Sequence, residues 1–321
     1  MQTFWQDLPR PFTVLAPLDG VTDVVFRQII TDIGKPDVLF TEFTPVEGFV
    51  SKGRKRVEEN FLFTPSQKPI IAQIWGTKPE QFYIVAKELS GRGFVGIDIN
   101  MGCPERVVVK NGACSALIKN PSLAAEIIQA TKEGAGELPV SVKTRIGFSQ
   151  PIIDEWIRFI LQQNIAALTV HLRTVAEMSA VDAHWELMTE VMRLRDEISP
   201  QTIVIGNGDI TSLAEIEEKY NKYGCDGFMV GRGIFANPWI FNKEVCMEEK
   251  TVEERVSLYL KHIDLFEKQW KGTHNFALLK KFAKTYISNF PEASELRVKL
   301  MESKRIEELR QTLLEYTNTN Q

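Results

Sequence analysis

Eight short runs of apolar residues, rich in β-branched and aromatic side chains, recur along the first three quarters of the chain. Successive positions within each run are apolar, which is typical of strands buried on both faces of a parallel sheet. Segments with helical signals separate the runs. We therefore predict strands at residues 12–16, 38–43, 69–75, 94–99, 139–144, 166–171, 202–206 and 227–230.

Two of the intervening segments begin with recognisable helix caps. Thr77 lies three residues before Glu80, with Pro79 between them, which is the spacing of a capping box. Asn120 stands directly before Pro121 in a similar arrangement. We expect Thr77 and Asn120 to cap the helices that follow them.

Eight repeats of strand and helix favour a closed (β/α)₈ TIM barrel that ends near Asn242. The alternative is an open, doubly wound sheet of the Rossmann type. No Gly-x-Gly-x-x-Gly motif follows the first predicted strand, which weakens that alternative.

From Thr251 onward, apolar residues recur at steps of three and four, which predicts amphipathic helices. A third helical stretch is predicted from about Ala293 to Tyr316. The apolar positions of the first two helices are Val252, Val256, Tyr259, Ile263, Phe266 and Trp270, and then Phe276, Leu279, Ala283, Tyr286 and Phe290. We expect a barrel domain at residues 1–245 and a C-terminal all-helical domain at residues 246–321.

The composition is that of an ordinary soluble protein, with 44% hydrophobic and 25% charged residues among 321. No apolar run approaches the roughly 20 residues that span a bilayer, and the first ten residues lack a signal-peptide core. We expect a cytoplasmic protein. The net charge of −4 argues against a protein that coats nucleic acid without discrimination.

The four cysteines lie too far apart for a Cys-x-x-Cys pair, which argues against an iron–sulfur cluster, a structural zinc site and a disulfide framework. They are Cys103, Cys114, Cys225 and Cys246. We expect free thiols and no metal, with a structural role for the last three.

Polar residues follow every predicted strand. In a (β/α)₈ barrel the carboxyl ends of the strands build the active site, so these residues are expected to meet at one rim. In strand order they are Pro17, Leu18 and Asp19; Glu42; Gln73; Asn100 and Cys103; Lys143 and Arg145; His171 and Arg173; Asn207, Gly208 and Asp209; and Gly231, Arg232 and Gly233.

The last two of these groups have the composition of a phosphate site. Glycine-rich loops after strands seven and eight are where such barrels hold phosphate, and Arg232 adds a guanidinium group. Plain turns are the alternative for each tripeptide alone.

Three residues within the strand ends carry candidate chemistry. The turn from Asn100 to Pro104 exposes the thiol of Cys103, which would otherwise be a small buried hydrophobe. Lys143 and His171 lie within apolar strands and need partners there, which an anionic cofactor would supply. Alternatively, Lys143 pairs with Glu42 or Asp98, and His171 bonds to a backbone carbonyl group.

Together these residues resemble the dihydrouridine synthase family of flavin enzymes, which reduce selected uridines in tRNA. The matching segments follow the strand order and cover the whole barrel. They are Ala-Pro-Leu-Asp-Gly-Val-Thr-Asp at 16–23, Thr-Glu-Phe at 41–43, Gln73, Asn-Met-Gly-Cys-Pro at 100–104, Val-Lys-Thr-Arg at 142–145, His-Leu-Arg-Thr at 171–174, Asn-Gly-Asp at 207–209 and Gly-Arg-Gly at 231–233.

The resemblance implies FMN at the barrel rim, NADPH as the reductant and tRNA as the partner of a chain that we expect to be monomeric. It implies that Cys103 is the general acid that protonates C5 of uracil, since an unperturbed thiol is mostly protonated at neutral pH. Asn100, Arg145 and Arg173 are implied as substrate-binding residues. The implied FMN ligands are Pro17, Leu18, Asp19, Gln73, Lys143, His171, Asn207, Gly208, Asp209, Gly231 and Arg232.

Two basic segments are candidates for contact with RNA phosphates. One is residues 52–56. The other consists of lysines on the first two C-terminal helices, namely Lys261, Lys268, Lys271, Lys280, Lys281 and Lys284. A solvated helix face, balanced by nearby glutamates, is the alternative for the lysines.

Two other functions compete with this interpretation. An FMN barrel that reduces or oxidises a free pyrimidine or another small molecule would share the phosphate loops and a cysteine, but it has no evident need for a lysine-bearing helical tail. A non-catalytic protein that binds RNA or sequesters flavin would not require a proton donor such as Cys103.

Overall fold

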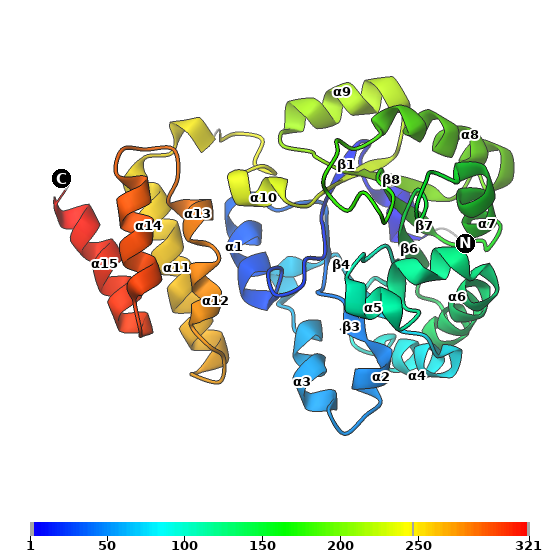
Figure 1. Cartoon of the computed structure of the whole chain (residues 1–321), viewed down its shortest axis with the longest axis horizontal. Coiled ribbons are helices and arrows are strands. Elements are labelled where there is room, and N and C mark those ends of the chain that lie inside the picture. Colours follow the sequence, from blue (N-terminus) through cyan, green and yellow to red (C-terminus); the bar gives the residue numbers. More distant parts are fainter. Residues whose placement is uncertain (1–2, 246, 320–321) are drawn as a thin grey trace. The chain divides into compact units, whose positions relative to one another are not determined.

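The computed structural model describes residues 3–245 and 247–319. The chain forms two compact units (Figure 1). Unit 1 comprises Met1–Asp23 and Pro36–Gly231, and unit 2 comprises Val24–Lys35 and Arg232–Gln321. The predicted boundary between residues 245 and 246 remains a prediction, and Cys246 itself lies outside the described residues.

Unit 1 is a closed barrel of eight parallel strands, as the sequence predicted. All eight predicted strands are present, and Thr44–Pro45 adds a short ninth strand, β3, which pairs with β4. The ring closes where β2 pairs with β4 and β1 pairs with β9. The strands are β1 (Phe12–Leu15), β2 (Val38–Phe40), β3 (Thr44–Pro45), β4 (Ile70–Trp75), β5 (Gly96–Met101), β6 (Val140–Arg145), β7 (Ala167–His171), β8 (Ile203–Asn207) and β9 (Gly227–Val230).

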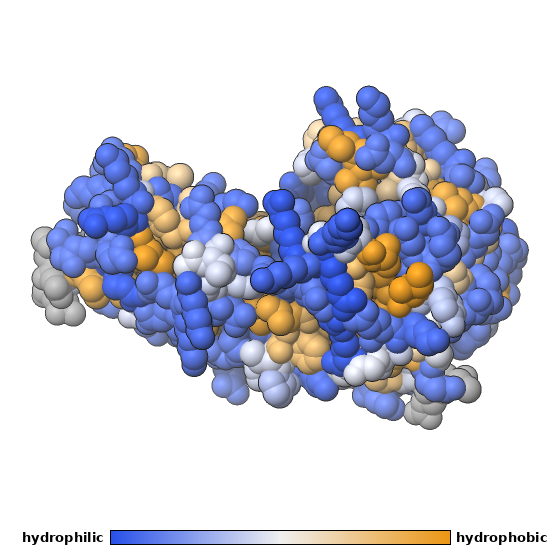
Figure 2. Space-filling view, turned by 90° about the horizontal axis from the view of Figure 1, so that it is seen from below, coloured by the Kyte–Doolittle hydropathy of each residue, from blue (hydrophilic) through white to orange (hydrophobic). Residues whose placement is uncertain are grey.

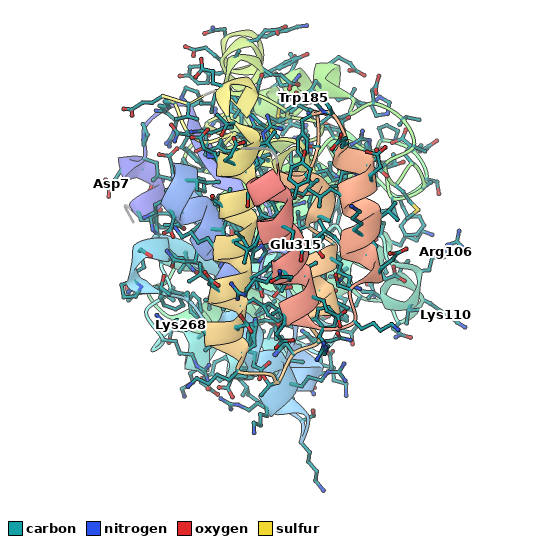
Figure 3. All side chains as sticks on the ribbon, turned by 90° about the vertical axis from the view of Figure 1, so that its left-hand side faces the viewer. Asp7, Arg106, Lys110, Trp185, Lys268 and Glu315 are labelled. Atoms are coloured by element: carbon teal, nitrogen blue, oxygen red, sulfur yellow. The ribbon has the colours of Figure 1, made fainter. Side chains whose placement is uncertain are left out.

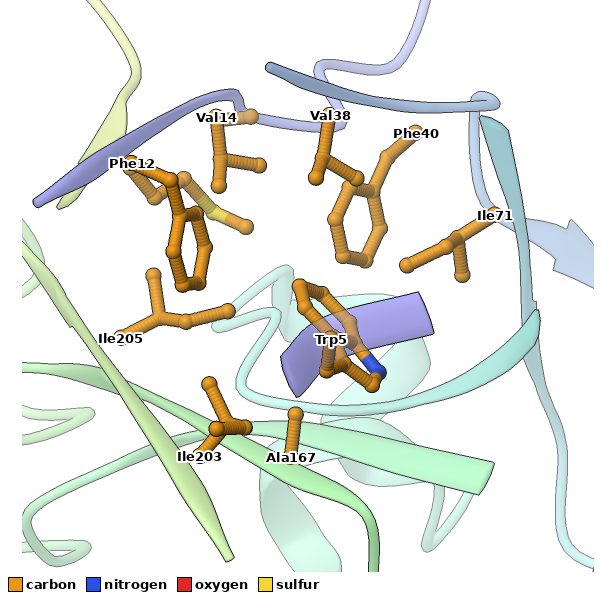
Figure 4. Close-up of a cluster of buried hydrophobic side chains, with 11 residues drawn as sticks. Trp5, Phe12, Val14, Val38, Phe40, Ile71, Ala167, Ile203 and Ile205 are labelled. Carbon is orange, nitrogen blue, oxygen red and sulfur yellow. The ribbon is translucent and has the colours of Figure 1, made fainter. Parts of the chain in front are cut away.

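The amino-end half of the barrel interior is apolar and tightly filled. Side chains from strand starts, including those of Phe12, Val38 and Ile203, converge there (Figure 4). Trp5, on the short 3₁₀-helix η1 (Phe4–Asp7), packs into the same cluster and is 1% exposed. Because side chains alternate along a strand, the interior positions further along each strand lie in the carboxyl-end half, and many of these are polar.

Helices and short turns connect the strands of unit 1. Asn120 caps α6 as predicted, since its side chain accepts a hydrogen bond from the Leu123 N–H. The prediction for Thr77 is wrong, because α4 begins at Pro79 after Lys78, and Thr77 donates instead to the Glu47 carboxylate. The helices are α2 (Val46–Phe49), α3 (Arg54–Glu58), α4 (Pro79–Leu89), α5 (Arg106–Lys110), α6 (Pro121–Ala135), α7 (Arg158–Leu161), α8 (Met188–Ile198) and α9 (Leu213–Tyr223). The shorter turns are 3₁₀-helices η2 (Glu59–Phe61), η3 (Pro65–Gln67), η4 (Cys114–Lys119) and η6 (Trp185–Leu187), and a π-turn η5 (Ile153–Ile157).

Unit 2 is helical and includes one helix from early in the chain. Phe26 of α1 stacks on Phe282, with 4.7 Å between the ring centroids. The buried His262 ring nitrogen Nδ1 lies 2.9 Å from the Tyr286 hydroxyl group. The elements are α1 (Val24–Gly34), α10 (Gly233–Ala236), η7 (Met247–Glu249), α11 (Val252–Trp270), α12 (Ala277–Lys280), α13 (Ala283–Tyr286), α14 (Ala293–Glu302) and α15 (Ile306–Thr319).

The first predicted C-terminal helix is confirmed as α11, but the second and third are each interrupted. The Tyr259 hydroxyl group donates to the Leu279 carbonyl oxygen, 2.8 Å away, at the point where the second predicted helix breaks into α12 and α13. The Lys280 ammonium group donates to the carbonyl oxygens of Met301 and Ser303, at the point where α14 ends and before α15 begins. Hydrogen bonds of this kind, between residues distant in sequence, cannot be predicted from the spacing of apolar residues.

The face drawn in Figure 2 is mostly hydrophilic, with separate apolar patches. No helix in the described part of the chain is both long and apolar enough to cross a bilayer. Within residues 3–245 and 247–319, no cluster of three or more His, Cys, Asp or Glu side chains has the arrangement of a metal site.

Candidate active site

The barrel brings the polar ends of strands β4 to β8 together. In the strand register, Gln73 lies beside Asp98, and Asn100 lies beside Lys143. One step further along, Arg145 lies beside His171, which in turn lies beside Asn207. Register partners in a parallel sheet point to the same face, so these residues, all of them predicted site residues except Asp98, line one end of the barrel interior.

The side chain of Asn100 holds the loop that carries Cys103. Its Oδ1 atom accepts hydrogen bonds from the N–H groups of Gly102 and Cys103, each 3.0 Å long. The Ser115 hydroxyl group donates to the Cys103 carbonyl oxygen at 2.8 Å. The loop therefore fixes Cys103, which is partly exposed at the end of β5.

A second thiol lowers the pKa of Cys103. A hydrogen bond from the buried Cys114 thiol is the main cause that lowers the pKa of Cys103 to about 7, and a backbone N–H from Glu105 and the charge of Lys143 contribute in the same direction. Cys103 is therefore more acidic than the unperturbed thiol that the sequence analysis assumed.

The sequence indicated only a structural role for Cys114, in the core or a turn, and gave no sign of its contact with Cys103. Cys114 is fully buried and has a left-handed backbone, with φ of 51°. The two cysteines are not close enough in sequence to form a recognisable motif, so only the fold reveals the pair. Cys225 is buried elsewhere in unit 1, and burial raises its pKa to about 12.

Lys143 provides a cation at the centre of the polar end. Burial is the main cause that lowers the pKa of its ammonium group to about 8, and the nearby charge of Arg145 acts in the same direction. No close ion pair joins it to Glu42 or Asp98 among the described residues, but the charge of Asp98, one of the two alternatives suggested by the sequence, acts on it and favours the ammonium form. Glu42 instead accepts a hydrogen bond of 2.6 Å from the Gly20 N–H.

Arg145 and Arg173 are buried and bonded to the segment that follows β7. Arg145 donates to the carbonyl oxygens of Gly102, Thr174 and Met178, over 2.8–3.0 Å. Arg173 forms an ion pair with Asp209 and donates to the Val181 carbonyl oxygen. Both guanidinium groups thus join residues 172–185, here called the β7 segment, to the rest of the rim.

The predicted phosphate loops occupy the ends of β8 and β9. Asn207 ties these strands together, since its Nδ2 atom donates to the Met229 carbonyl oxygen at 2.7 Å. Gly208 has φ of 140°, and an added Cβ atom there would lie 2.6 Å from the Ala183 Cβ atom, so only glycine fits. At Gly231 the nearest neighbour of such an atom is Ala16, at 3.9 Å, which leaves room for a ligand.

The remaining predicted ligands lie after β1 and β9. Pro17 is buried, Leu18 is half-buried and Asp19 is exposed, in a turn where the Leu18 N–H donates to the Thr22 hydroxyl oxygen at 2.8 Å. Arg232 directly follows Gly231 and is the first residue of the second part of unit 2. Its role remains a prediction.

A closed parallel barrel, with an acidic thiol and a buried ammonium group at the carboxyl ends of its strands, has the architecture of a (β/α)₈-barrel enzyme. The sequence model described as "Dihydrouridine synthase (Dus)" matches residues 14–321. The chain therefore belongs to the dihydrouridine synthase family and is an oxidoreductase.

Relatives with curated names match over nearly their whole length. The chain is 48% identical over 320 residues to a "Probable tRNA-dihydrouridine synthase" of Staphylococcus aureus (strain MRSA252), covering 98% of this chain and 96% of that protein. It is 47% identical over 317 residues to "Probable tRNA-dihydrouridine synthase 2" of Bacillus subtilis (strain 168), covering 97% and 96%.

Solved structures of more distant proteins share the barrel fold. Histamine dehydrogenase from Rhizobium sp. 4-9 aligns with a TM-score of 0.54 at 13% identity, covering 79% of this chain and 48% of that chain. A variant of NCR from Zymomonas mobilis aligns with a TM-score of 0.50 at 15% identity, covering 74% and 89%.

Proposed function

We propose that this protein is an FMN-dependent tRNA-dihydrouridine synthase, which reduces the C5=C6 bond of specific uridines in tRNA with NADPH as the reductant. The observation that carries the proposal is the similarity to curated tRNA-dihydrouridine synthases, which extends over both compact units. We further propose that the chain acts as a monomer in the cytoplasm.

The residues at the rim fit an anionic, hydrogen-bonding cofactor such as FMN. Lys143 forms no close ion pair among the described residues, and burial lowers its pKa although the nearby charges of Asp98 and Cys103 favour the ammonium form; a bound flavin that accepts its N–H groups would compensate its buried charge further. Its register partner Thr169 has a buried hydroxyl oxygen without a hydrogen-bond partner among the described residues. Gly208 and Gly231 provide backbone that a phosphate group can approach. The residues proposed to hold FMN are Pro17, Leu18, Asp19, Gln73, Lys143, His171, Asn207, Gly208, Asp209, Gly231 and Arg232.

Cys103 is proposed as the catalytic acid. Reduced FMN would supply the hydride to one carbon of the C5=C6 bond, and the Cys103 thiol would donate a proton to C5. An acid with a pKa of about 7 transfers its proton effectively near neutral pH. The thiolate left behind is stabilised by the hydrogen bond from Cys114 and by the charge of Lys143.

Asn100, Arg145 and Arg173 are proposed to bind the substrate. Asn100 lies directly before the Cys103 loop, where it can hold the uracil ring next to the thiol. Arg145 and Arg173 are proposed to contribute to substrate binding indirectly, because their hydrogen bonds hold the β7 segment in place. The target base must leave its stack to reach this site.

Several basic side chains are free to contact RNA phosphates. Of the six lysines predicted in unit 2, Lys261 pairs with Asp32 and Lys280 bonds the end of α14, so neither is free. Lys268, Lys271, Lys281 and Lys284 are exposed and form no described ion pair. In unit 1, Arg106 and Lys110 extend away from α5, the helix that follows Cys103 (Figure 3).

The proposal is tested by incubating the purified protein with NADPH and an unmodified tRNA transcript, then measuring dihydrouridine in the digested RNA by mass spectrometry. Uridine monophosphate serves as the matched control for a free pyrimidine. We expect dihydrouridine in the tRNA only. Reduction of the free nucleotide but not of tRNA would contradict the proposal.

Deleting the gene and mapping dihydrouridine in total RNA identifies the positions modified in the cell. Loss at one or a few tRNA positions is the expected result. If no position changes, the assignment to RNA fails even where the protein binds flavin.

A further inference from the structure

Four polar side chains form an unbroken line of hydrogen bonds that ends at the Cys103 loop. The Ser141 hydroxyl group donates to Asp98 Oδ1 at 2.6 Å, and Gln73 Nε2 donates to Asp98 Oδ2 at 2.7 Å. Asn100 Nδ2 donates to Gln73 Oε1 at 3.0 Å, and Asn100 Oδ1 receives the two N–H groups of the loop. Asp98 and Gln73 are completely buried, and Asn100 is 5% exposed.

The groups at the two ends of this line determine which side-chain atoms donate and which accept along it. Backbone N–H groups can only donate, so Asn100 must turn its oxygen toward the loop and its Nδ2 atom toward Gln73. Gln73 must then accept with its oxygen and donate with Nε2. An ionised carboxylate, which only accepts, completes the line at its other end, and Asp98 is that carboxylate. Burial raises the pKa of Asp98 to about 6, and the hydrogen bonds from Ser141 and Gln73 and the charge of Lys143 favour the ionised form.

We propose that Asp98 is a positioning residue for Cys103, because it anchors the amides of Gln73 and Asn100 in the one orientation that holds the Cys103 loop. Only the effect on turnover rests on the proposed function. The effect on the thiol itself does not, because it depends on the loop alone.

The loop geometry determines the environment of the thiol. Held in place, Cys103 receives hydrogen bonds from Cys114 and from the Glu105 N–H, and it lies near the charges of Lys143 and Glu105. If the line is broken at Asp98, Gln73 loses its acceptor and Asn100 loses its fixed partner. The loop then shifts and the thiol loses part of the stabilisation of its thiolate form.

The decisive variant is Asp98→Leu, which branches at the same carbon atom as aspartate but accepts no hydrogen bond. Ser141→Ala is the matched control, because it removes a bond to Asp98 and leaves the line to Cys103 intact. Asp98→Asn is the conservative rescue, since its oxygen can accept from Gln73 while its Nδ2 atom donates to the Ser141 oxygen.

The first measurement is the rate at which iodoacetamide alkylates Cys103, as a function of pH, in the purified protein with its bound flavin quantified. We expect the profile of Asp98→Leu to move to higher pH, with the rate at pH 7 reduced roughly 5- to 15-fold, the loss of thiolate that follows if the pKa rises from about 7 most or all of the way to the ordinary thiol value of about 8.5. Ser141→Ala and Asp98→Asn should stay within about threefold of the unmodified protein.

The second measurement is turnover with NADPH and tRNA, which should fall in Asp98→Leu and not in the two other variants. An Asp98→Leu profile identical to that of Ser141→Ala would overturn the role of Asp98. If the unmodified protein alkylates as described but reduces no tRNA, the proposed function fails and the role of Asp98 stands.

A further variant covers the case in which Asp98→Leu does not fold. Gln73→Met breaks the same line between Asp98 and Asn100 without removing a charge, and it should move the alkylation profile in the same direction. An unchanged profile in Gln73→Met would show that no effect passes along the line, and would overturn the proposal.

Discussion

At the scale of single residues, the chemistry of the site depends on contacts between side chains that are distant in sequence. Cys103 could be selected from the sequence because its turn follows a buried strand. Its pKa of about 7 could not, because it depends on Cys114, whose left-handed backbone brings its thiol to Cys103. Likewise, the bonds that occupy Arg145 and Arg173 come from a segment whose path the sequence pattern did not predict.

Replacing Cys114 with alanine should raise the pKa of Cys103 from about 7 toward the ordinary thiol value of about 8.5. The thiolate loses the hydrogen bond that stabilises it, so the basic limb of turnover and the alkylation profile both move to higher pH. Cys114→Ser, whose hydroxyl group can still donate, should keep most of the shift.

Cys225→Ala is the control for this prediction, because Cys225 is buried and has a pKa raised to about 12. It should leave the pH profile unchanged. A Cys114→Ala protein with the unmodified profile would show that the second thiol does not set the acidity of Cys103.

At the scale of elements, strands were predictable because a strand that is buried on both faces consists of a continuous run of apolar residues. Helix ends were less predictable. The Thr77 hydroxyl group donates a hydrogen bond to Glu47 and does not cap α4. The Tyr259 hydroxyl group donates to the Leu279 carbonyl oxygen, where the second predicted C-terminal helix is interrupted. In both cases the hydrogen-bond partner belongs to another element. The β7 segment carries its own pair, His184 and Glu177, whose Nε2 and Oε1 atoms lie 2.9 Å apart.

This pair makes the β7 segment sensitive to pH. The hydrogen bond to Glu177 is the main cause that raises the pKa of His184. A raised pKa stabilises the folded segment fully below the unfolded value of about 6.5, and this stabilisation is lost as pH rises through the folded pKa. The gain is modest, about 0.5 kcal/mol or less, because solvent screens the pair.

Hydrogen exchange of residues 174–183 should therefore be slower, relative to the rest of the barrel, at pH 5.5 than at pH 8.5. His184→Gln should remove this difference. Equal pH dependence in both proteins would mean that the ion pair does not hold the segment.

At the scale of the whole molecule, the barrel was predicted correctly, but the sequence did not predict that α1 belongs to unit 2. In sequence, α1 looks like the helix of the first barrel repeat, yet it forms one compact unit with the C-terminal helices, where Phe26 stacks on Phe282. An amphipathic pattern shows that a helix has an apolar face, but it does not say which element covers that face.

The basic segment at residues 52–56 separates into two kinds of side chain. Arg54 is bound to Glu58 and Glu88, whereas Lys52, Lys55 and Arg56 are exposed and have no described ion pair. Replacing these three with alanine should weaken tRNA binding and reduce the salt dependence by about one unit of slope for each phosphate group that the variant no longer binds.

Arg54→Ala is the matched control. It should lower the stability of the protein and leave the dependence of tRNA affinity on salt concentration unchanged. The measurement is tRNA affinity between low and moderate salt. An unchanged slope in the triple variant would place the RNA contacts elsewhere, on α5 or on the free lysines of unit 2.

The central claim, that the polar strand ends form one active site in which Cys103 donates the proton, is tested most directly by Cys103→Ala. The protein is loaded with flavin, reduced, mixed with unmodified tRNA and analysed for dihydrouridine in a single turnover. The account predicts unchanged flavin content and a rate lowered by roughly 10²- to 10⁴-fold. Dihydrouridine formed at the unmodified rate would contradict it.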